Sequence, residues 1–277
     1  MSLNPKVSIH IIRIYVIPRL IYGLETIRIA AADLTAINMY FKRLLKQIQH
    51  LPERTSDAAT YLLLGQIAIT GEIHKRALTT FGNIIRDFGT VECELAHRQL
   101  AVKSKKSHSW FILVSEILEQ YGLPSSHDLL QNPPGKLSWK NTVYRAVNQY
   151  WENKLKEEAY TKSTLKYLNI DNMEIRKTHM VWEAAGYESM SVSKAMIKVK
   201  LLLGSYILQS NRHKFNKYEV RPDCPLCNSG DEDRKHFIVV CSKLMEVRQK
   251  FIIALKNIYI LVCIIICVIP YLVTLIH

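Results

Sequence analysis

Three cysteines and one histidine near the C-terminus have the types and the spacing of a metal site. Cys224, Cys227, His236 and Cys241 form the pattern C-x2-C-x8-H-x4-C within eighteen residues. Thiolate and imidazole groups are ligands that tetrahedral zinc prefers, and a C-x-x-C turn can direct two thiolates at one ion. Four protein ligands leave no open position for a reacting water. The pattern therefore predicts a structural zinc rather than a hydrolytic one.

The residues between the ligands add detail to this prediction. Asp233 can cap a helix whose first turn carries His236, and the rest of the acidic run 231–233 is expected to be solvated loop. The five-residue step from His236 to Cys241 places Cys241 at a bend. The alternative is that the four residues are neighbours in sequence without a metal. Structural zinc modules often mediate protein contacts, so zinc alone does not predict nucleic-acid binding.

The segments that position this site are predicted to be helical. Apolar residues recur at helical spacing along most of the first 220 residues, without a sustained strand-like alternation. We expect a helix to start at Asn4-Pro5 and to kink at Pro18, because proline is favoured at the start of a helix and disfavoured inside it. The strongest patterns predict helices over 138–160 and 191–209. The predicted fold is mainly α: a helical array, a small CCHC zinc module and a C-terminal apolar helix.

Composition shifts divide the chain into four expected regions. Residues 125–126 and 132–135 are rich in serine, proline and glycine and mark a link between two helical regions. The expected regions are 1–130, 136–220, the zinc module 221–250 and the apolar tail 258–276.

The net charge of +13 and the pI near 9.4 favour an anionic partner, either nucleic acid or a membrane surface. One basic cluster, 98–106, is interpreted as an ordinary solvated surface. A second cluster is the candidate for phosphate contacts, together with a lysine inside the zinc module: Lys194, Lys198, Lys200, Arg212, Lys214, Lys217 and Lys235. Tyr206, Phe215 and Tyr218 are interleaved with it and are candidates for stacking on unpaired bases.

The six cysteines do not resemble a disulfide framework, and no cleavable N-terminal signal is evident, so a reducing compartment is expected. Residues 258–276 contain no charged side chain and are long enough to span a bilayer as a helix. Three explanations of this tail remain open. It is a tail anchor, sequence read through beyond a broken frame, or a segment buried against the helical region.

Three stretches resemble one protein family. Residues 4–25, with Asn4-Pro-Lys-Val-Ser8 and Tyr15-Val-Ile-Pro18-Arg-Leu-Ile-Tyr-Gly23, resemble the helical segment after the polymerase core of non-LTR (LINE-like) retrotransposon reverse transcriptases. The stretch 51–65 resembles a further block of that family, and the C-x2-C-x8-H-x4-C pattern resembles its zinc-binding module. The resemblance covers roughly residues 3–250 and is most specific at the zinc pattern.

The resemblance implies a parent RNA-directed DNA polymerase, with residues 1–130 as a thumb-like or connector-like region. Such a polymerase needs paired aspartates to hold two metal ions, and this chain has no Asp-Asp pair. We therefore expect a non-catalytic fragment that binds zinc and RNA or DNA in the nucleus or cytoplasm. The alternative is a zinc-stabilised protein-interaction module, tail-anchored in a membrane. No hydrolase, P-loop or metalloprotease pattern supports another activity.

Overall fold

The computed structural model describes residues 3–216, 219–254 and 256. It divides into two compact units, 1–205 and 206–277. The mainly helical fold is confirmed, since 66% of the structure is helix and no strand occurs among the described residues. The division at 205/206 falls inside the expected region 136–220, before the expected start of the zinc module at 221, and no division falls between 130 and 136.

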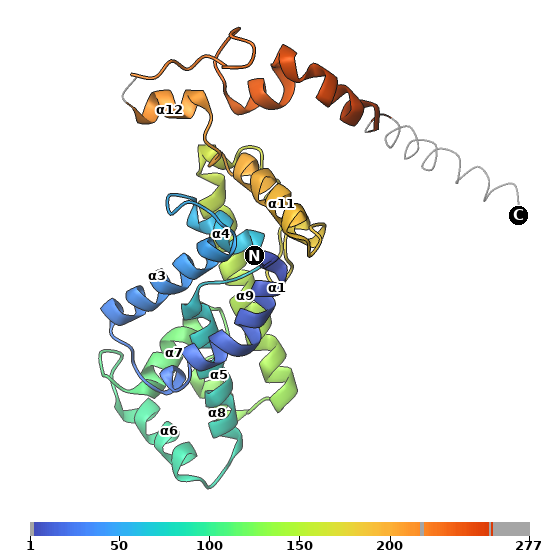
Figure 1. The fold of residues 1–277 in the computed structure, drawn as a ribbon. Coiled ribbons are helices and arrows are strands. Elements are labelled where there is room, and N and C mark those ends of the chain that lie inside the picture. Colours follow the sequence, from blue (N-terminus) through green and yellow to red (C-terminus); the bar gives the residue numbers. More distant parts are fainter. Residues whose placement is uncertain (1–2, 217–218, 255, 257–277) are drawn as a thin grey trace, which may run out of the picture. The chain divides into compact units, whose positions relative to one another are not determined.

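The first unit is an array of helices (Figure 1). The α-helices of this unit are α1 (Pro5–Ile11), α2 (Ile17–Leu20), α3 (Ala31–Ile48), α4 (Asp57–Leu63), α5 (Ile69–Arg86), α6 (Val91–Val102), α7 (Trp110–Gln120), α8 (Ser126–Gln131), α9 (Lys136–Tyr160), α10 (Met180–Glu183) and α11 (Ser189–Leu202). Its other helical turns are the π-helix η1 (Ile12–Val16) and the 3-10 helices η2 (Leu24–Thr26) and η3 (Ser163–Leu165).

The start of the chain follows the sequence prediction. The Asn4 side chain accepts a 2.9 Å hydrogen bond from the backbone N–H of Lys6, and Pro5 occupies the first turn of α1. The helical path then loosens into the π-helical turn η1 immediately before Pro18. Proline lacks an N–H and clashes with the carbonyl four residues earlier, so an irregular turn at this place is expected.

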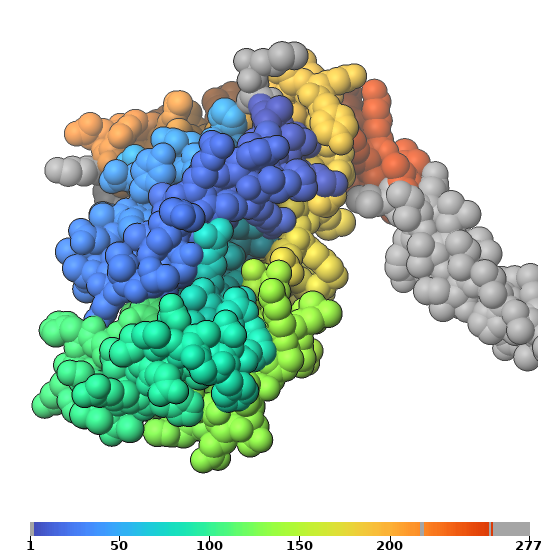
Figure 2. Space-filling model, turned by 90° about the horizontal axis from the view of Figure 1, so that it is seen from below, coloured from blue at the N-terminus to red at the C-terminus, as the bar shows by residue number. Residues whose placement is uncertain are grey.

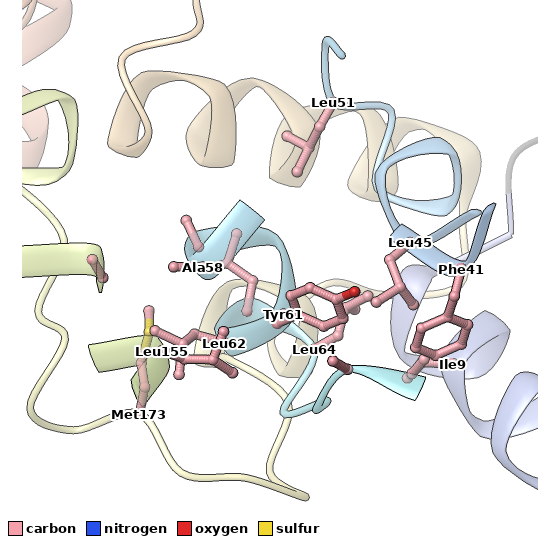
Figure 3. Packing of buried hydrophobic residues seen from close by; sticks show 14 of the residues in the cluster. Ile9, Phe41, Leu45, Leu51, Ala58, Tyr61, Leu62, Leu64, Leu155 and Met173 are labelled. Carbon is pink, nitrogen blue, oxygen red and sulfur yellow. The ribbon is translucent and has the colours of Figure 1, made fainter. Parts of the chain in front are cut away.

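Helix α9 explains why the region before residue 130 and the region after 136 form one unit. Its N-terminal half places Trp139, Val143 and Val147 in a buried cluster with α5 to α8. Its C-terminal half places Leu155 and Ala159 in a second cluster with residues of α1, α3, α4 and α11. Figure 3 shows part of this second cluster, and Figure 2 shows the blue N-terminal helices bordering the teal and green surface of later helices. Because α9 contributes buried residues to both clusters, the two clusters belong to one unit.

Helices α5 and α9 approach closely at two glycines of α5, Gly71 against Trp151 and Gly82 against Trp139. A Cβ added to Gly82 would lie 2.2 Å from Cδ1 of Trp139, so only glycine fits opposite this ring. The ring is held in place because its Nε1–H donates to the carbonyl of Leu78 at 2.9 Å. The Gly82–Trp139 contact therefore sets how closely α5 and α9 pack.

Helix α11 is shorter than the sequence predicted. It ends at Leu202, and Gly204 adopts the left-handed conformation with φ 65°. Glycine in this conformation is a common helix terminator. The expectation of one helix over 191–209 was therefore wrong at its C-terminal end, and Tyr206 belongs to the second unit.

The second unit contains α12 (Gln209–Phe215), the π-helix η4 (His236–Val240) and the 3-10 helix η5 (Ser242–Leu244), followed by helical residues 245–254. Within the described residues, no helix combines the length and the hydrophobicity needed to cross a bilayer. The expected apolar helix 258–276 lies outside the described residues, and the structure does not support that part of the fold prediction.

Candidate metal centre

The four sequence-predicted ligands converge in the second unit. One ligand atom from each of Cys224, Cys227, His236 and Cys241 lies within 4.8 Å of the others. Cys224 Sγ is 3.9 Å from Cys241 Sγ, and Cys227 Sγ is 3.2 Å from His236 Nε2. Zinc–sulfur bonds of about 2.3 Å in a regular tetrahedron place two sulfur atoms about 3.8 Å apart. The spacing of the four ligand atoms is therefore close to that of the ligands around one tetrahedrally coordinated ion.

The first two cysteines are presented by a tight turn. The backbone N–H of Asn228 donates to the carbonyl of Cys224 at 2.9 Å, and Asn228 has a positive φ of 52°. The N–H of Cys224 in turn donates to the carbonyl of Gly230 at 2.9 Å, next to an isolated bridge between Asp223 and Asp231. These bonds close the loop and bring the two thiols of the C-x-x-C turn to one side.

The other two ligands are presented by the π-helix η4. The backbone N–H of His236 donates to the carboxylate of Asp233 at 2.6 Å, as the sequence predicts for a capping residue. The helix then makes one π-type turn, and Cys241 ends it with a non-helical backbone (φ −53°, ψ 118°). A π turn bonds residues five apart, so it matches the spacing between His236 and Cys241.

The ligands are shielded from solvent to different degrees. Cys224 and Cys241 have no exposed surface and His236 is 7% exposed, while Cys227 is partly exposed. Burial raises the pKa of the Cys224 thiol. The pKa of Cys227 falls to about 6, first because the Ser229 hydroxyl donates to its sulfur, at 3.2 Å. A thiol with this lowered pKa is ready to bind a metal as thiolate.

Glu232 is a supporting residue that the sequence interpretation misplaced. We expected the acidic run to be solvated, but Glu232 is only 8% exposed. Its carboxylate accepts from the backbone N–H of Gln209 at 2.8 Å, and its carbonyl accepts from the Ser210 hydroxyl at 2.9 Å. Glu232 therefore connects the start of α12 to the segment 224–241 that carries the four candidate ligands (the metal loop). Its neighbour Asp231 is exposed, as expected.

Arg248 is a second supporting residue that sequence reasoning did not assign to the site. Its guanidinium donates to the backbone carbonyls of Val239 and Cys241. The bonds hold the end of η4 and the last ligand together. The seven-residue step from Cys241 to Arg248, about two helical turns, is the only signal in the sequence, and it is not specific.

The candidate phosphate-contacting residues fall in both units. Lys194 and Lys198 are exposed one turn apart on α11 of the first unit, with Lys200 partly buried. Arg212 and Lys214 are exposed on α12 of the second unit, and Lys235 is exposed directly before His236. Lys217 lies outside the described residues.

The aromatic candidates are divided in a similar way. The Tyr206 ring stacks on Phe237, with ring centroids 6.2 Å apart, so it packs within its own unit. Phe215 is 59% exposed, and Tyr218 lies outside the described residues.

Comparison of the chain with models of protein families, with curated proteins and with solved structures gave no match.

Proposed function

We propose that this chain is a non-catalytic, zinc-stabilised region that binds RNA or DNA, of the kind found at the C-terminal end of non-LTR retrotransposon reverse transcriptases. The observation that carries the proposal is the convergence of three cysteines and one histidine on a space of one ion. Thiolate-rich sets with all four positions taken are typical of structural zinc.

Three of the exposed cations of the second unit support the nucleic-acid role. Arg212, Lys214 and Lys235 are exposed on the elements that the metal loop and Glu232 hold in place. Residues 206–277 contain ten lysines and arginines against six acidic residues. A basic surface fixed by a metal presents its charges without first having to order the chain, and clustered cations of this kind neutralise phosphates.

The zinc assignment is tested by metal analysis of the purified chain. The wild type should contain one zinc per chain, and Cys224→Ser and His236→Ala should each lose it. Cys93→Ser is the matched control, because Cys93 is a buried cysteine of α6 in the other unit. Structural zinc is worth about 10–16 kcal/mol in small zinc domains at neutral pH. Unchanged stoichiometry in both ligand variants would remove the metal site.

The nucleic-acid role is tested by titrating single-stranded RNA and nicked duplex DNA at several salt concentrations. The triple variant of Arg212, Lys214 and Lys235 to alanine should flatten the salt dependence by a slope of about 2 on single strands, from about 0.7 for each phosphate contact. The matched control is the triple alanine variant of Lys103, Lys105 and Lys106, exposed lysines of the first unit. Affinity that ignores salt, or equal losses in both variants, would refute the assigned surface.

One observation favours a second candidate function, a protein-interaction module. Ile238, Val239 and Val240 lie between His236 and Cys241 and are 48%, 59% and 55% exposed. Apolar groups exposed together often mark protein contacts. If this function is the correct one, the chain fails to bind nucleic acid in the titration above, and substituting these three residues by serine removes association with a protein partner while zinc content stays unchanged.

A further inference from the structure

The first unit contains a second cluster of cations that the sequence patterns did not indicate. A cavity of ≈ 210 Å³ is lined by Arg13, Lys75, Arg76 and Arg176, with Glu72 as its one acidic lining residue. These side chains come from η1, from α5 and from the loop before α10, so only the tertiary structure brings them together. Lys75 pairs with Glu72 at 3.0 Å and Arg76 with Glu25 at 3.9 Å, so the excess of positive charge around this space comes from Arg13 and Arg176.

Lys75 is the most deeply placed of these cations. It is 3% exposed, and its Nζ pairs with Glu72 at 3.0 Å and lies 5.2 Å from the centre of the Tyr144 ring. Burial lowers the pKa of Lys75, Glu72 opposes this shift, and the charges of Arg176 and Arg13 add smaller contributions that lower the pKa. A buried ammonium beside other cations costs folding free energy unless an anion compensates it.

Two of the three arginines at this cavity, Arg13 and Arg176, keep donors for a ligand. The Nη2 group of Arg13 donates to the carbonyls of Leu64 and Gly65, at 2.8 and 3.1 Å, and its Nη2 and Nε groups also donate to the side-chain oxygen of Gln66. Its Nη1 group makes no hydrogen bond within the described residues. Burial, and then the charge of Arg176, lower the pKa of Arg13. Among the described residues, no carboxylate lies within 4.0 Å of the guanidinium of Arg13 or Arg176.

An unusual backbone conformation places Arg176 at this cavity. Arg176 has a positive φ of 76°, which non-glycine residues rarely adopt. Its N–H donates to the carbonyl of Gly65 at 2.8 Å. Gly65 itself has a φ of 57°, and a Cβ at that position would lie 2.2 Å from the carbonyl oxygen of Lys177. A conformation that is unfavourable for arginine, supported by an approach that only glycine allows, is a common mark of a functional site.

The volume of the cavity limits the size of the ligand that it can bind. At about 30 Å³ for each water, the cavity has room for about seven waters, and it is smaller than the 300 Å³ or more typical of pockets for drug-sized molecules. A neighbouring cavity of ≈ 490 Å³ is also lined by Arg13 and Arg176. A small anionic group fits the first cavity, and the organic part of an ester has space in the second.

We infer that the cavity formed by Arg13, Lys75, Arg76 and Arg176 binds a phosphate group, either free phosphate or the terminal phosphate of a nucleotide chain. Planar guanidinium groups match the oxygen pairs of phosphate, and the lysine adds a point charge at the buried end. The exposed side chain of Arg176 allows entry from solvent. This site lies in the first unit and does not depend on the metal centre.

A larger cavity between α3 and α4 is also lined by several cations but is a weaker candidate. Its volume is ≈ 550 Å³. Asp57 already lies 2.7 Å from both Lys42 and Lys46, so the chain itself supplies the anion there. In the part of the chain that the structure describes, Arg13 and Arg176 have no such direct pair, and Glu72 acts on Arg13 only from beyond 4.0 Å.

The test is a titration of the full zinc-loaded chain with inorganic phosphate and pyrophosphate at constant ionic strength, followed by calorimetry and by the unfolding midpoint. We expect saturable binding that chloride does not reproduce. Arg176→Asn should weaken it at least 10-fold and still fold, because asparagine tolerates a positive φ. Lys75→Met should also lose the binding, since it removes the point charge at the buried end of the cavity. Arg145→Gln is the control, since Arg145 is exposed on α9 beside Tyr144 and does not line the cavity.

A second arm separates the two sources of phosphate. Oligonucleotides of one sequence, with a 5′-phosphate or a 5′-hydroxyl, are compared with the wild type and with Arg176→Asn. A preference for the phosphorylated strand that the variant loses assigns the cavity to a strand end. Binding of inorganic phosphate without such a preference assigns it to the free anion. The inference is overturned if neither anion nor strand end binds, or if Arg176→Asn and Lys75→Met bind phosphate as the wild type does.

Discussion

The backbone N–H of Cys241 donates a 2.8 Å hydrogen bond to the carbonyl of His236, five residues earlier. This single π-type bond closes the turn that carries two of the four candidate ligands, so the x4 spacing of the pattern is a structural requirement. An α-helical turn would bond residues four apart and place the two side chains differently.

Insertion of one alanine between Val239 and Val240 should therefore impair metal binding. The insertion rotates Cys241 away from the cluster while leaving every ligand in the chain. We expect zinc affinity to fall by at least about 10-fold, the lower end of what loss of even an outer-shell group costs. The measurement is competition with a coloured chelator. Val239→Ala is the control, because Val239 is 59% exposed and the substitution keeps the spacing. Equal affinities would show that the spacing has no role.

Glu232→Ala should release the start of α12 from the metal loop. The half-buried N–H of Gln209 loses its carboxylate partner, and an unpaired donor costs at most about 1–3 kcal/mol where it is buried. Hydrogen exchange of the Gln209 amide should accelerate accordingly, by roughly 5-fold or more at 1 kcal/mol. The exposed neighbour Asp231→Ala should leave this amide as protected as in the wild type. Unchanged exchange in Glu232→Ala would show that α12 is held by other contacts.

Gly82→Ala should destabilise the first unit. Helix propensity alone favours alanine over glycine by about 1 kcal/mol. Any measured loss of unfolding free energy is therefore a lower limit on the energy of the clash between the new Cβ and Trp139. We expect a net loss of about 1–3 kcal/mol in denaturant unfolding, the usual cost of overpacking. Asn83→Ala changes the next, exposed residue of the same helix and should stay within about 0.5 kcal/mol of the wild type. A stabilised Gly82→Ala variant would mean that the Trp139 ring can move aside at little cost in free energy.

His74 should make the first unit sensitive to mild acid. Burial lowers the pKa of His74 from 6.5 to about 4, and its Nδ1 lies 2.8 Å from the Tyr121 hydroxyl. The folded state holds the neutral ring, while the unfolded chain takes up a proton below pH 6.5. The stabilisation is therefore complete above pH 6.5 and falls as the pH drops toward 4. Between pH 7.5 and 5 the expected loss from this group is about 2 kcal/mol.

Unfolding of His74→Gln at both pH values measures this contribution. The variant should lose about 2 kcal/mol less than the wild type between pH 7.5 and 5. His97→Gln is the matched control, because His97 is exposed on α6 and should leave the pH dependence unchanged. If the wild type and His74→Gln show the same pH dependence, His74 does not couple folding to protonation.

Much of the candidate metal site could be predicted from the sequence because it is local. All four ligands lie within one short loop and turn, and Asp233 caps the turn three residues later, as its position indicates. The burial of Glu232 could not be predicted, since its partner is the backbone of Gln209, more than twenty residues away. Polar residues in a loop are normally solvated, and nothing in their order shows which one meets a helix end.

Helical spacing likewise determined the helices of the first unit, because an apolar stripe can be buried only at a period near 3.6 residues. It could not show that α9 belongs to two apolar clusters, so the loop before it resembled a boundary between regions. Helical spacing also could not show that Arg13, Lys75 and Arg176 line one cavity. These residues are far apart in the sequence, and Arg176 is held there by a hydrogen bond to the backbone carbonyl of Gly65. The sequence by itself determined the helices and the cluster of candidate metal ligands, because both depend on interactions over a few residues. The tertiary structure alone decided which surfaces meet and where charge accumulates, because those depend on packing between segments far apart in the chain.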